Sequence, residues 1–474
     1  MSDSKNYITR PIYIILTTII ILSFSYFLPP TVNVAGVQIK RVEIFSDLLQ
    51  VPEDTTDMNF EDDFFNSDSN GFSLNYNIGK NDYYEAGFSF SDLIDLLGIN
   101  SLSPKVGKDV PLQGNLKQLK NFFKALKNSR KAKIRIAHFG DSIIEGDLVT
   151  SQIREELQKK FGGKGVGFVP ITTQDVTFRQ SMKLAFSDNW KSYSIFTSNP
   201  NNLPVSVGGE VFIPEGNAWV EYKTSYFIRR QNSFSQAYLY LIPDKTFTLK
   251  YDVNGKEKNL RISKSSNLVR ADLGLKGKVK SLKIKVPANS GKYFGVSLEA
   301  GNGVYVDNYA LRGNSGIALK NISISEFKKF GKYLDYNLII LEFGVNALSN
   351  HPRDYMWYKK EMIQVIKNLQ TAFPKAGIIL VGVHDKSKKK GSRFISDTSI
   401  PRLLRTQMEI VKATNIAFWN LNKAMGGKNS MPKWVKSNPP LAFMDYTHFN
   451  NLGAKRVAEL FVNAILQAKN KSVK

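Results

Sequence analysis

A chain of 474 residues without a single cysteine excludes disulfide scaffolds, thiolate metal sites and thiol catalysis. Its length is about two to three times that of a typical domain, which predicts more than one packed unit. Only four histidines are present, which argues against a multi-histidine metal site. With 65 Lys and Arg against 41 Asp and Glu, the formal charge of +24 predicts an anionic partner, either nucleic acid, a membrane surface or an acidic polymer.

An uncharged apolar run of 17 residues occupies positions 12–28 and is preceded by Lys5 and Arg10. As a helix it would span about 25 Å, slightly less than the ~30 Å hydrocarbon core of a bilayer. The basic residues predict that residues 1–11 are cytoplasmic and that the following chain is exported. We expect a single-pass anchor in the inner membrane with the body on the periplasmic side. A signal peptide cleaved near residues 23–25 is the alternative, which would leave a periplasmic protein. Either form of export argues against a nucleic-acid partner.

Residues 29–110 are interpreted as an acidic juxtamembrane spacer. Between Glu43 and Asp95 there are 13 acidic residues and one basic residue, so this stretch carries −12 and the rest of the chain +36. Segment 61–77 is rich in Asp, Asn and Ser and has no sustained period, which predicts poor order or docking on the basic body. We expect the basic body to face the anionic surface of the cell envelope.

Apolar runs that alternate with helical patterns predict an α/β domain in the rest of the chain. The runs cover residues 134–139, 338–343, 377–383 and 416–421. The helical patterns cover residues 115–133, 353–372, 400–414 and 452–468. Strands that are apolar throughout and separated by helices are typical of a parallel sheet covered on both faces.

Residues 171–304 have a different pattern, with short alternating segments separated by turn signals such as Asn-Gly and Ala-Asn-Ser. This pattern is typical of an all-β domain. It predicts a β-sandwich inserted into the α/β domain, which would then consist of residues 111–170 and 305–474.

Candidate catalytic residues follow the apolar runs, because the carboxyl ends of parallel strands are where ligands bind. Gly140, Asp141 and Ser142 come directly after the first run, and Asp445 and His448 precede the last helix. A serine nucleophile needs a base and the base needs an acid to orient it, and Asp-x-x-His supplies both. A helix cap is the simpler interpretation of either segment alone.

Two further segments offer donors for an oxyanion. Asn346 lies three residues after the apolar run that ends at Phe343, and Gly316 lies in the loop "LRGNSGIAL". A side-chain amide or a backbone N–H at such positions can stabilise a developing oxyanion. Ordinary turn residues are the simpler interpretation of both.

These four segments resemble, in chain order, the four sequence blocks of the SGNH (GDSL-type) hydrolases. "GDSIIEGDLVT" and "FWNLNKAMGGKNSMPKW", followed by "DYTHFNNLGAKRVAE", look like the peptidoglycan O-acetylesterases of Gram-negative bacteria. Those esterases carry a β-sandwich, similar to a carbohydrate-binding module, between the serine and glycine blocks. The resemblance covers roughly residues 130–468. It implies a flavodoxin-like, three-layer fold with a five-stranded parallel sheet.

The resemblance also implies roles for individual residues. Ser142 would be the nucleophile, His448 the general base and Asp445 the group that orients the base. The Ser142 and Gly316 N–H groups and the Asn346 side chain would hold the oxyanion. The implied activity is a serine esterase that removes O-acetyl groups from a cell-envelope glycan through an acyl-enzyme, without a metal ion or cofactor.

The sequence departs from the family pattern at two positions and leaves other functions open. Ile143 follows the serine where these esterases tend to carry His, and Ala347 follows Asn346 where an acidic residue is frequent. An O-acetyltransferase or deacetylase acting on an exopolysaccharide is one alternative, and a non-catalytic glycan-binding protein is another. We expect Trp434, in the family-like segment, to be the tryptophan best placed to bind substrate. His138 and His384 are interpreted as a packed strand residue and a loop residue.

Overall fold

The computed structural model describes residues 31–34, 37–40 and 106–472, apart from 177, 178, 198 and 349–353. The chain divides into two units, residues 1–86 and 87–474. In the first, β1 (Thr31–Val34) and β2 (Val37–Lys40) form an antiparallel hairpin. No helix among the described residues has the length and apolar character needed to cross a membrane. The expected anchor at residues 12–28 lies outside them.

The second unit is built on a mixed sheet whose strand order is β16-β4-β17-β18-β21-β3. Five of its strands are parallel and β3 is an antiparallel edge strand. The strands are β3 (Gln113–Gly114), β4 (Lys133–Gly140), β16 (Gly303–Ala310), β17 (Tyr336–Glu342), β18 (Gly377–Val381) and β21 (Ala417–Trp419). The four apolar runs of the sequence are four of these strands, and five parallel strands are present as expected. The two-residue strand β3 was not anticipated.

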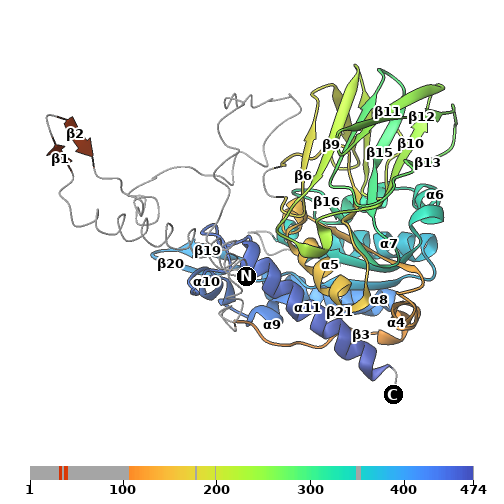
Figure 1. Ribbon diagram of the computed structural model, residues 1–474. Coiled ribbons are helices and arrows are strands. Elements are labelled where there is room, and N and C mark those ends of the chain that lie inside the picture. Colours follow the sequence, from red (N-terminus) through yellow and green to blue (C-terminus); the bar gives the residue numbers. More distant parts are fainter. Residues whose placement is uncertain are drawn as a thin grey trace, which may run out of the picture. The chain divides into compact units, whose positions relative to one another are not determined.

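Helices cover this sheet in two groups, as Figure 1 shows. The main helices are α4 (Lys120–Lys127), α5 (Leu148–Phe161), α6 (Ile324–Leu334), α7 (Met356–Ala372), α8 (Ile400–Thr414) and α11 (Asn451–Lys471). α5 packs against α11, and α7 packs against α6 and α8. Because parallel crossovers are right-handed, helices on opposite sides of the reversal in strand order lie on opposite faces. The result is a three-layer α/β fold.

The inserted domain is a β-sandwich of two antiparallel sheets. One sheet contains β5 (Gly167–Val169), β7 (Trp190–Ser194), β8 (Glu210–Pro214), β10 (Gln236–Pro243), β13 (Val269–Asp272) and β15 (Gly291–Glu299). The other contains β6 (Met182–Phe186), β9 (Ala218–Thr224), β11 (Phe247–Val253), β12 (Lys256–Ile262) and β14 (Ser281–Val286). Buried side chains such as Val220, Leu239 and Val296 form a core of its own. Each contributes about 1.5–3 kcal/mol by its burial.

The sandwich begins a few residues before the expected start at 171 and ends just before the expected end at 304. β5, before residue 171, pairs with β15, whereas β16 begins at Gly303 and pairs with β4 of the parallel sheet. At the other end of the α/β body, the chain is already packed from about residue 106. Val110 and Leu112 are buried, and the Trp419 indole N–H donates to the Val110 carbonyl oxygen at 3.1 Å.

Smaller elements surround the carboxyl edge of the sheet. They are the hairpin of β19 (Ser387–Lys390) and β20 (Arg393–Ser396), and the short helices α9 (Leu421–Met425) and α10 (Ser430–Val435). A two-residue turn joins β19 to β20, and its neighbours Lys389, Lys390 and Arg393 are exposed.

A buried cluster of charges joins the sandwich to the sheet. Glu299, at the end of β15, is fully buried and pairs with Arg135 and Lys133 of β4, the Lys133 Nζ–Glu299 Oε2 distance being 2.6 Å. Arg135 also lies 3.6 Å from the Asp307 carboxylate of β16. Burial alone would raise the pKa of Glu299, but the charges of Arg135 and Lys133 lower it to about 2. The two cations therefore keep this carboxylate ionised inside the protein.

Removing one partner from this cluster is expected to destabilise the fold. Glu299→Gln would leave the buried Arg135 guanidinium with Asp307 as its remaining anion, and breaking a buried pair costs about 3–5 kcal/mol. We expect a loss of about 3 kcal/mol in the free energy of unfolding, measured by urea denaturation. The control is Glu257→Gln, because Glu257 forms an exposed pair with Lys285 and should lose less than about 1 kcal/mol. Equal losses in the two variants would contradict the importance of the cluster.

Candidate active site

Ser142 lies in the turn that follows β4, at the point where the strand order reverses. β4 is the first of the parallel strands along the chain, and the later strands are added on both of its sides. Ligands of open α/β sheets bind outside the carboxyl ends of strands at such a reversal. The backbone is tightly packed here: a Cβ on Gly140 would lie 2.7 Å from the Ile144 side chain and 3.0 Å from the Glu342 carbonyl oxygen. Glycine therefore permits the turn that carries the half-buried Ser142.

Hydrogen bonds fix the residues on either side of Ser142. The Asp141 carboxylate accepts from the Ile143 backbone N–H at 3.0 Å. The Asn308 side-chain amide, from β16, donates to the Ile144 carbonyl oxygen at 2.8 Å. The turn is thus held by its own aspartate and by the neighbouring strand.

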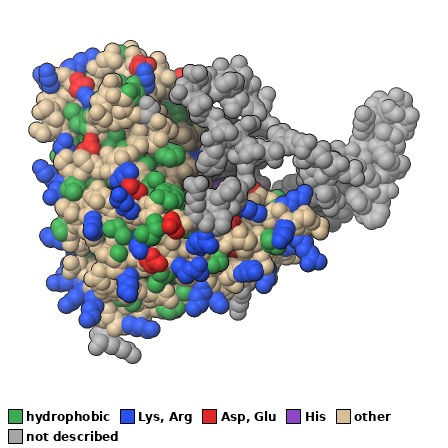
Figure 2. Space-filling model, turned by 180° about the vertical axis from the view of Figure 1, so that it is seen from behind, with side chains coloured by type: hydrophobic (Ala, Val, Ile, Leu, Met, Phe, Trp, Pro, Cys, Tyr) green, Lys and Arg blue, Asp and Glu red, His purple; other side chains and the backbone are tan. Residues whose placement is uncertain are grey.

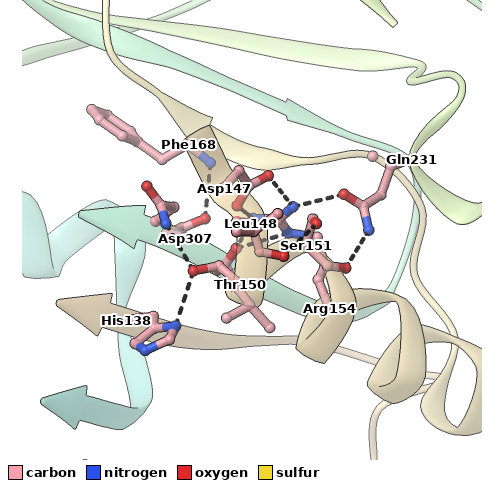
Figure 3. Close-up of polar contacts among 12 residues, drawn as sticks. His138, Asp147, Leu148, Thr150, Ser151, Arg154, Phe168, Gln231 and Asp307 are labelled. Atoms are coloured by element: carbon pink, nitrogen blue, oxygen red, sulfur yellow. Dashed lines mark hydrogen bonds and ion pairs between the residues drawn. The ribbon is translucent and has the colours of Figure 1, made fainter. Parts of the chain in front are cut away.

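Helix α5 begins a few residues later and is held by a buried ion pair (Figure 3). Asp147, at the N-cap, has a positive φ of 66°. The Arg154 guanidinium binds its carboxylate with two hydrogen bonds, of 2.7 and 3.0 Å, and donates to Gln231 of the sandwich at 2.7 Å. Since bidentate pairs constrain geometry, Arg154 fixes both the start of α5 and its position against the insertion.

A second group of buried polar side chains includes His138 and Thr150 (Figure 3). His138, inside β4, lies 3.0 Å from Glu342 Oε2 through its Nε2 and 3.0 Å from Thr150 Oγ1 through its Nδ1. The Asn308 amide also donates to Thr150 Oγ1, at 2.7 Å. The packed strand residue expected at position 138 is thus also a hydrogen-bonded link between β4, β17 and α5.

The structure brings Ser142, His448 and Asp445 together. The His448 Nε2 atom lies 2.9 Å from Ser142 Oγ, and its Nδ1 lies 2.6 Å from Asp445 Oδ2. The other oxygen of Asp445 accepts from the backbone N–H groups of Thr447 and His448 at 2.9 and 3.0 Å. These distances are those of a nucleophile, its base and the acid that orients the base.

Hydrogen bonds in this loop keep Asp445 ionised. Partial burial would raise the pKa of the carboxyl group, but hydrogen bonds from the His448 ring and from the backbone N–H groups of His448 and Thr447 lower it below its ordinary value. Asp445 thus remains an acceptor for the His448 Nδ1–H, and the imidazole Nε2 is available to take a proton from Ser142.

His384 contacts the loop that carries Asp445 and His448 and stabilises its conformation. The His384 Nε2–H donates to the Thr447 carbonyl oxygen, the two atoms being 2.9 Å apart, and its ring packs on Phe449 with centroids 5.1 Å apart. Burial, reinforced by the charges of His448 and Lys386, lowers the pKa of His384 to about 4, so the ring is neutral near pH 7. From the sequence, His384 was expected in a solvated loop, but its side chain is buried. Its position three residues after β18, at the same edge of the sheet, is the signal that could have indicated its contact with the loop of His448.

The β19–β20 hairpin supports the same loop from a second side. The Phe394 ring stacks on Tyr446 with centroids 3.7 Å apart, and the Ser387 N–H donates to the Tyr446 carbonyl oxygen at 3.1 Å. Tyr446 has a positive φ of 55°, an unusual conformation for a bulky residue. These contacts hold the sharp turn between Asp445 and His448.

His384→Phe is expected to impair catalysis without removing a reacting group, because it keeps an aromatic ring but loses the donor to the Thr447 carbonyl. Small misplacements of catalytic groups have large kinetic effects, and we expect kcat for a small acetyl ester to fall about tenfold with KM nearly unchanged. His384→Gln, whose amide can donate, should recover part of the loss. Equal loss in both variants, or none in His384→Phe, would contradict this positioning role.

The two expected oxyanion donors lie next to the site but are engaged within the protein. The Gly316 N–H donates to Asn314 Oδ1 at 2.8 Å. The Asn346 amide donates to Asp141 Oδ2 at 3.0 Å and to the Asn314 carbonyl oxygen at 3.4 Å. Within the described part of the chain, the Ser142 backbone N–H has no hydrogen-bond partner. Asn314, which contacts both donors, was not identified from the sequence.

Asp141 is the buried acid between these groups. Burial raises its pKa to about 7, and the nearby Glu342 carboxylate adds to this, whereas the Ile143 N–H, His448 and the Asn346 amide oppose it. The contacts of Asp141 with Ile143 and Asn346 both place it as an acceptor. Asp141 therefore links the turn of Ser142 to the loop of Asn346.

The expectation for Trp434 is wrong. Its side chain is fully buried, its indole N–H donates to the Met425 carbonyl oxygen at 3.0 Å, and its ring packs on Phe449 with centroids 5.4 Å apart. No face of the ring is left for a substrate. The Trp434 carbonyl oxygen accepts from the Leu441 N–H at 2.9 Å, just before the loop of Asp445 and His448. The position of Trp434 in the family-like segment had suggested a substrate contact that its burial excludes.

Comparison with solved structures identifies the fold. One match is described as "Peptidoglycan O-acetylesterase in action", with a TM-score of 0.63 and 19% sequence identity over 76% of this chain and 99% of that one. An acetyl xylan esterase (TM-score 0.25, 18% identity, 34% and 81% coverage) and a family two carbohydrate esterase from Cellvibrio japonicus (TM-score 0.25, 8% identity, 61% and 99% coverage) are much less similar. No family model matches the sequence, and neither does any curated protein. This chain thus shares its fold with the structure described as a peptidoglycan O-acetylesterase, as the resemblance in the sequence implied.

Proposed function

We propose that this chain is a serine esterase that removes O-acetyl groups from a cell-envelope glycan. The observation that carries the proposal is the hydrogen-bonded series Ser142–His448–Asp445, with distances of 2.9 and 2.6 Å, at the reversal point of the sheet. His448 lies 306 residues beyond Ser142 along the chain, so a chance arrangement of helix caps does not account for the geometry of the three residues.

The reaction follows from this geometry. His448 Nε2 takes the proton of Ser142 Oγ as the oxygen attacks the ester carbonyl carbon. The bond between the acyl carbon and the sugar oxygen then breaks, and His448 returns the proton to that oxygen. The acetyl group remains on Ser142. Water attacks this acyl-enzyme with His448 as base, and acetate is released. Asp445 stabilises the imidazolium in both steps.

The oxyanion that forms in each step requires donors. The Ser142 N–H is available directly, whereas Gly316 and Asn346 must exchange their present acceptors for the substrate oxygen. Catalytic hydrogen bonds often reach their final geometry only once the substrate is bound.

Two observations support a glycan as substrate. The fold is similar to that of the structure described as a peptidoglycan O-acetylesterase. In addition, the side chains of His448 and Asp445 are 37% and 47% exposed, so the reacting groups are accessible from the surface. A surface site suits esters on a long polymer, which cannot enter a closed pocket.

Ser142 is expected to be essential to the proposed esterase activity. Ser142→Ala removes the nucleophile and should lower kcat/KM for 4-nitrophenyl acetate at least about 10³-fold, and Asp445→Asn should lower it about 10²- to 10⁴-fold. Ser392→Ala, in the exposed turn between β19 and β20, is the matched control and should keep full activity. Acetate release from O-acetylated peptidoglycan, compared with an O-acetylated exopolysaccharide, defines the glycan.

Full activity of the Ser142→Ala variant would refute the proposed serine esterase activity. A chain that neither hydrolyses esters nor reacts with a fluorophosphonate at Ser142 would instead be a glycan-binding protein. Transfer of acetyl groups to an added sugar, faster than acetate release, would identify a transferase.

We also propose that the basic body acts at the anionic surface of the cell envelope, on the outer side of the inner membrane. The apolar run at residues 12–28 and the charge of +36 outside residues 43–95 motivate this location. Figure 2 shows Lys and Arg side chains spread over the visible face of the body, with fewer Asp and Glu side chains between them. A long-range attraction to anionic polymers follows from such a distribution.

Salt should weaken this attraction. The Debye length falls from about 10 Å at 0.1 M salt to about 3 Å at 1 M, so the fraction of full-length protein that sediments with purified anionic envelope polymers should fall steeply over this range. Binding that is unchanged between the two salt concentrations would contradict an electrostatic origin.

A further inference from the structure

A cavity lies between the β-sandwich and the carboxyl edge of the sheet, next to the turn of Ser142. Its volume is about 360 Å³, which falls in the range of small-ligand sites. The α/β body contributes Glu145, Gly146 and residues 308–312 to its wall, and the sandwich contributes residues of β6, β7 and β8. Ser142 is not part of the wall. The cavity is therefore a neighbour of the reacting groups and is formed by both domains.

The wall on the side of the α/β body belongs to the backbone that positions Ser142. Glu145 is three residues beyond Ser142, and its carboxylate accepts from the Arg312 side chain at 2.6 Å. The Leu311 N–H donates to the Gly140 carbonyl oxygen at 3.0 Å. A ligand in the cavity would thus lie against the same turn that carries the nucleophile.

The wall on the side of the sandwich presents aromatic rings. Trp190, Tyr193 and Phe196 line the cavity, and the Phe196 side chain is 44% exposed. Phe196 also reaches the loop of Gly316, because a Cβ on Gly313 would come within 3.5 Å of its ring. Aromatic rings pack against the apolar C–H faces of a pyranose, while their edges leave its hydroxyl groups to polar partners.

A polar partner of this kind is present in Glu210, on β8. Glu210 lines the cavity, and among the described residues neither a hydrogen bond nor a charge shifts the pKa of its carboxyl group. Burial raises the pKa of Glu210 to about 8. A carboxyl group that is largely protonated near pH 7 both donates and accepts hydrogen bonds, which matches an uncharged sugar hydroxyl better than a cation.

We propose that this cavity is the subsite for the sugar next to the acetylated residue, held between Phe196 and the hydroxyl-binding Glu210. The proposal rests on the glycan esterase function proposed above. In this proposal the inserted sandwich forms part of the active-site cleft, and residues of both domains determine which substrate binds. A distant, independent sugar-binding site on the sandwich is the arrangement that it excludes.

The test compares a polymer fragment with an ester that has no neighbouring sugar. The full-length chain is assayed on soluble O-acetylated peptidoglycan fragments and on 4-nitrophenyl acetate, and the ratio of the two kcat/KM values is the readout. We expect Phe196→Ala and Glu210→Gln each to lower this ratio about tenfold, mainly through KM for the glycan. The matched controls are Phe227→Ala and Glu257→Gln, since both residues are exposed on the sandwich away from the cavity and should leave the ratio unchanged.

The outcomes separate this proposal from the one on which it rests. If the wild-type chain cleaves the glycan and both cavity variants keep its ratio, the subsite is refuted while the esterase stands. Variants that lose both activities equally, with unchanged thermal unfolding, would place these residues in catalysis and also refute the subsite. A wild-type chain that cleaves the small ester but not the glycan would refute the glycan function and the subsite together.

Discussion

The reversal of strand order at β4 is the constraint on which the candidate site depends. Because the chain adds strands on both sides of β4, its crossovers diverge there and leave the carboxyl end of this strand uncovered. The turn with Ser142 occupies that place. Parallel strands all end at the same edge, so the loops that carry Asn346 and His448 arrive beside Ser142 although they are distant in sequence. A sheet with strands added on one side alone would cover this end with a helix.

Buried polar groups convert this topology into a fixed geometry. The pair of Arg154 and Asp147 sets the start of α5, and the cluster around Glu299 sets the sandwich against the sheet. Charges inside a protein are costly unless paired. The pairs of Glu299 with Lys133 and Arg135 cross the boundary between the two domains, whereas Arg154 pairs with Asp147 inside the α/β body and crosses the boundary through its hydrogen bond to Gln231. The Glu299 cluster therefore fixes the sandwich at the amino end of β4, and Phe196 of the sandwich lies near Gly313, beyond the carboxyl end of β16. A cleft shared by two domains requires this fixed position.

The sequence was sufficient where a residue pattern repeats or a motif is local. Apolar runs identified four parallel strands, and the spacing of Asp445 and His448 identified two partners of Ser142. The expected border at residue 304 cuts through β16, and only the pairing of this strand with β4 assigns it to the parallel sheet. The contact of His384 with the loop of His448 joins residues far apart in the chain, which a motif cannot reveal. Burial of Trp434 is likewise a property of packing.

The exposure of the His448 side chain also bears on the fate of an acetyl group bound to Ser142. An imidazole that is 37% exposed is in contact with solvent, so a water molecule can approach it from the bulk without displacing any part of the protein. Acetyl transfer to another sugar would require that water be kept away while the acceptor arrives. In the proposed esterase, an open site of this kind would shorten the lifetime of the acyl-enzyme and direct its acetyl group to water.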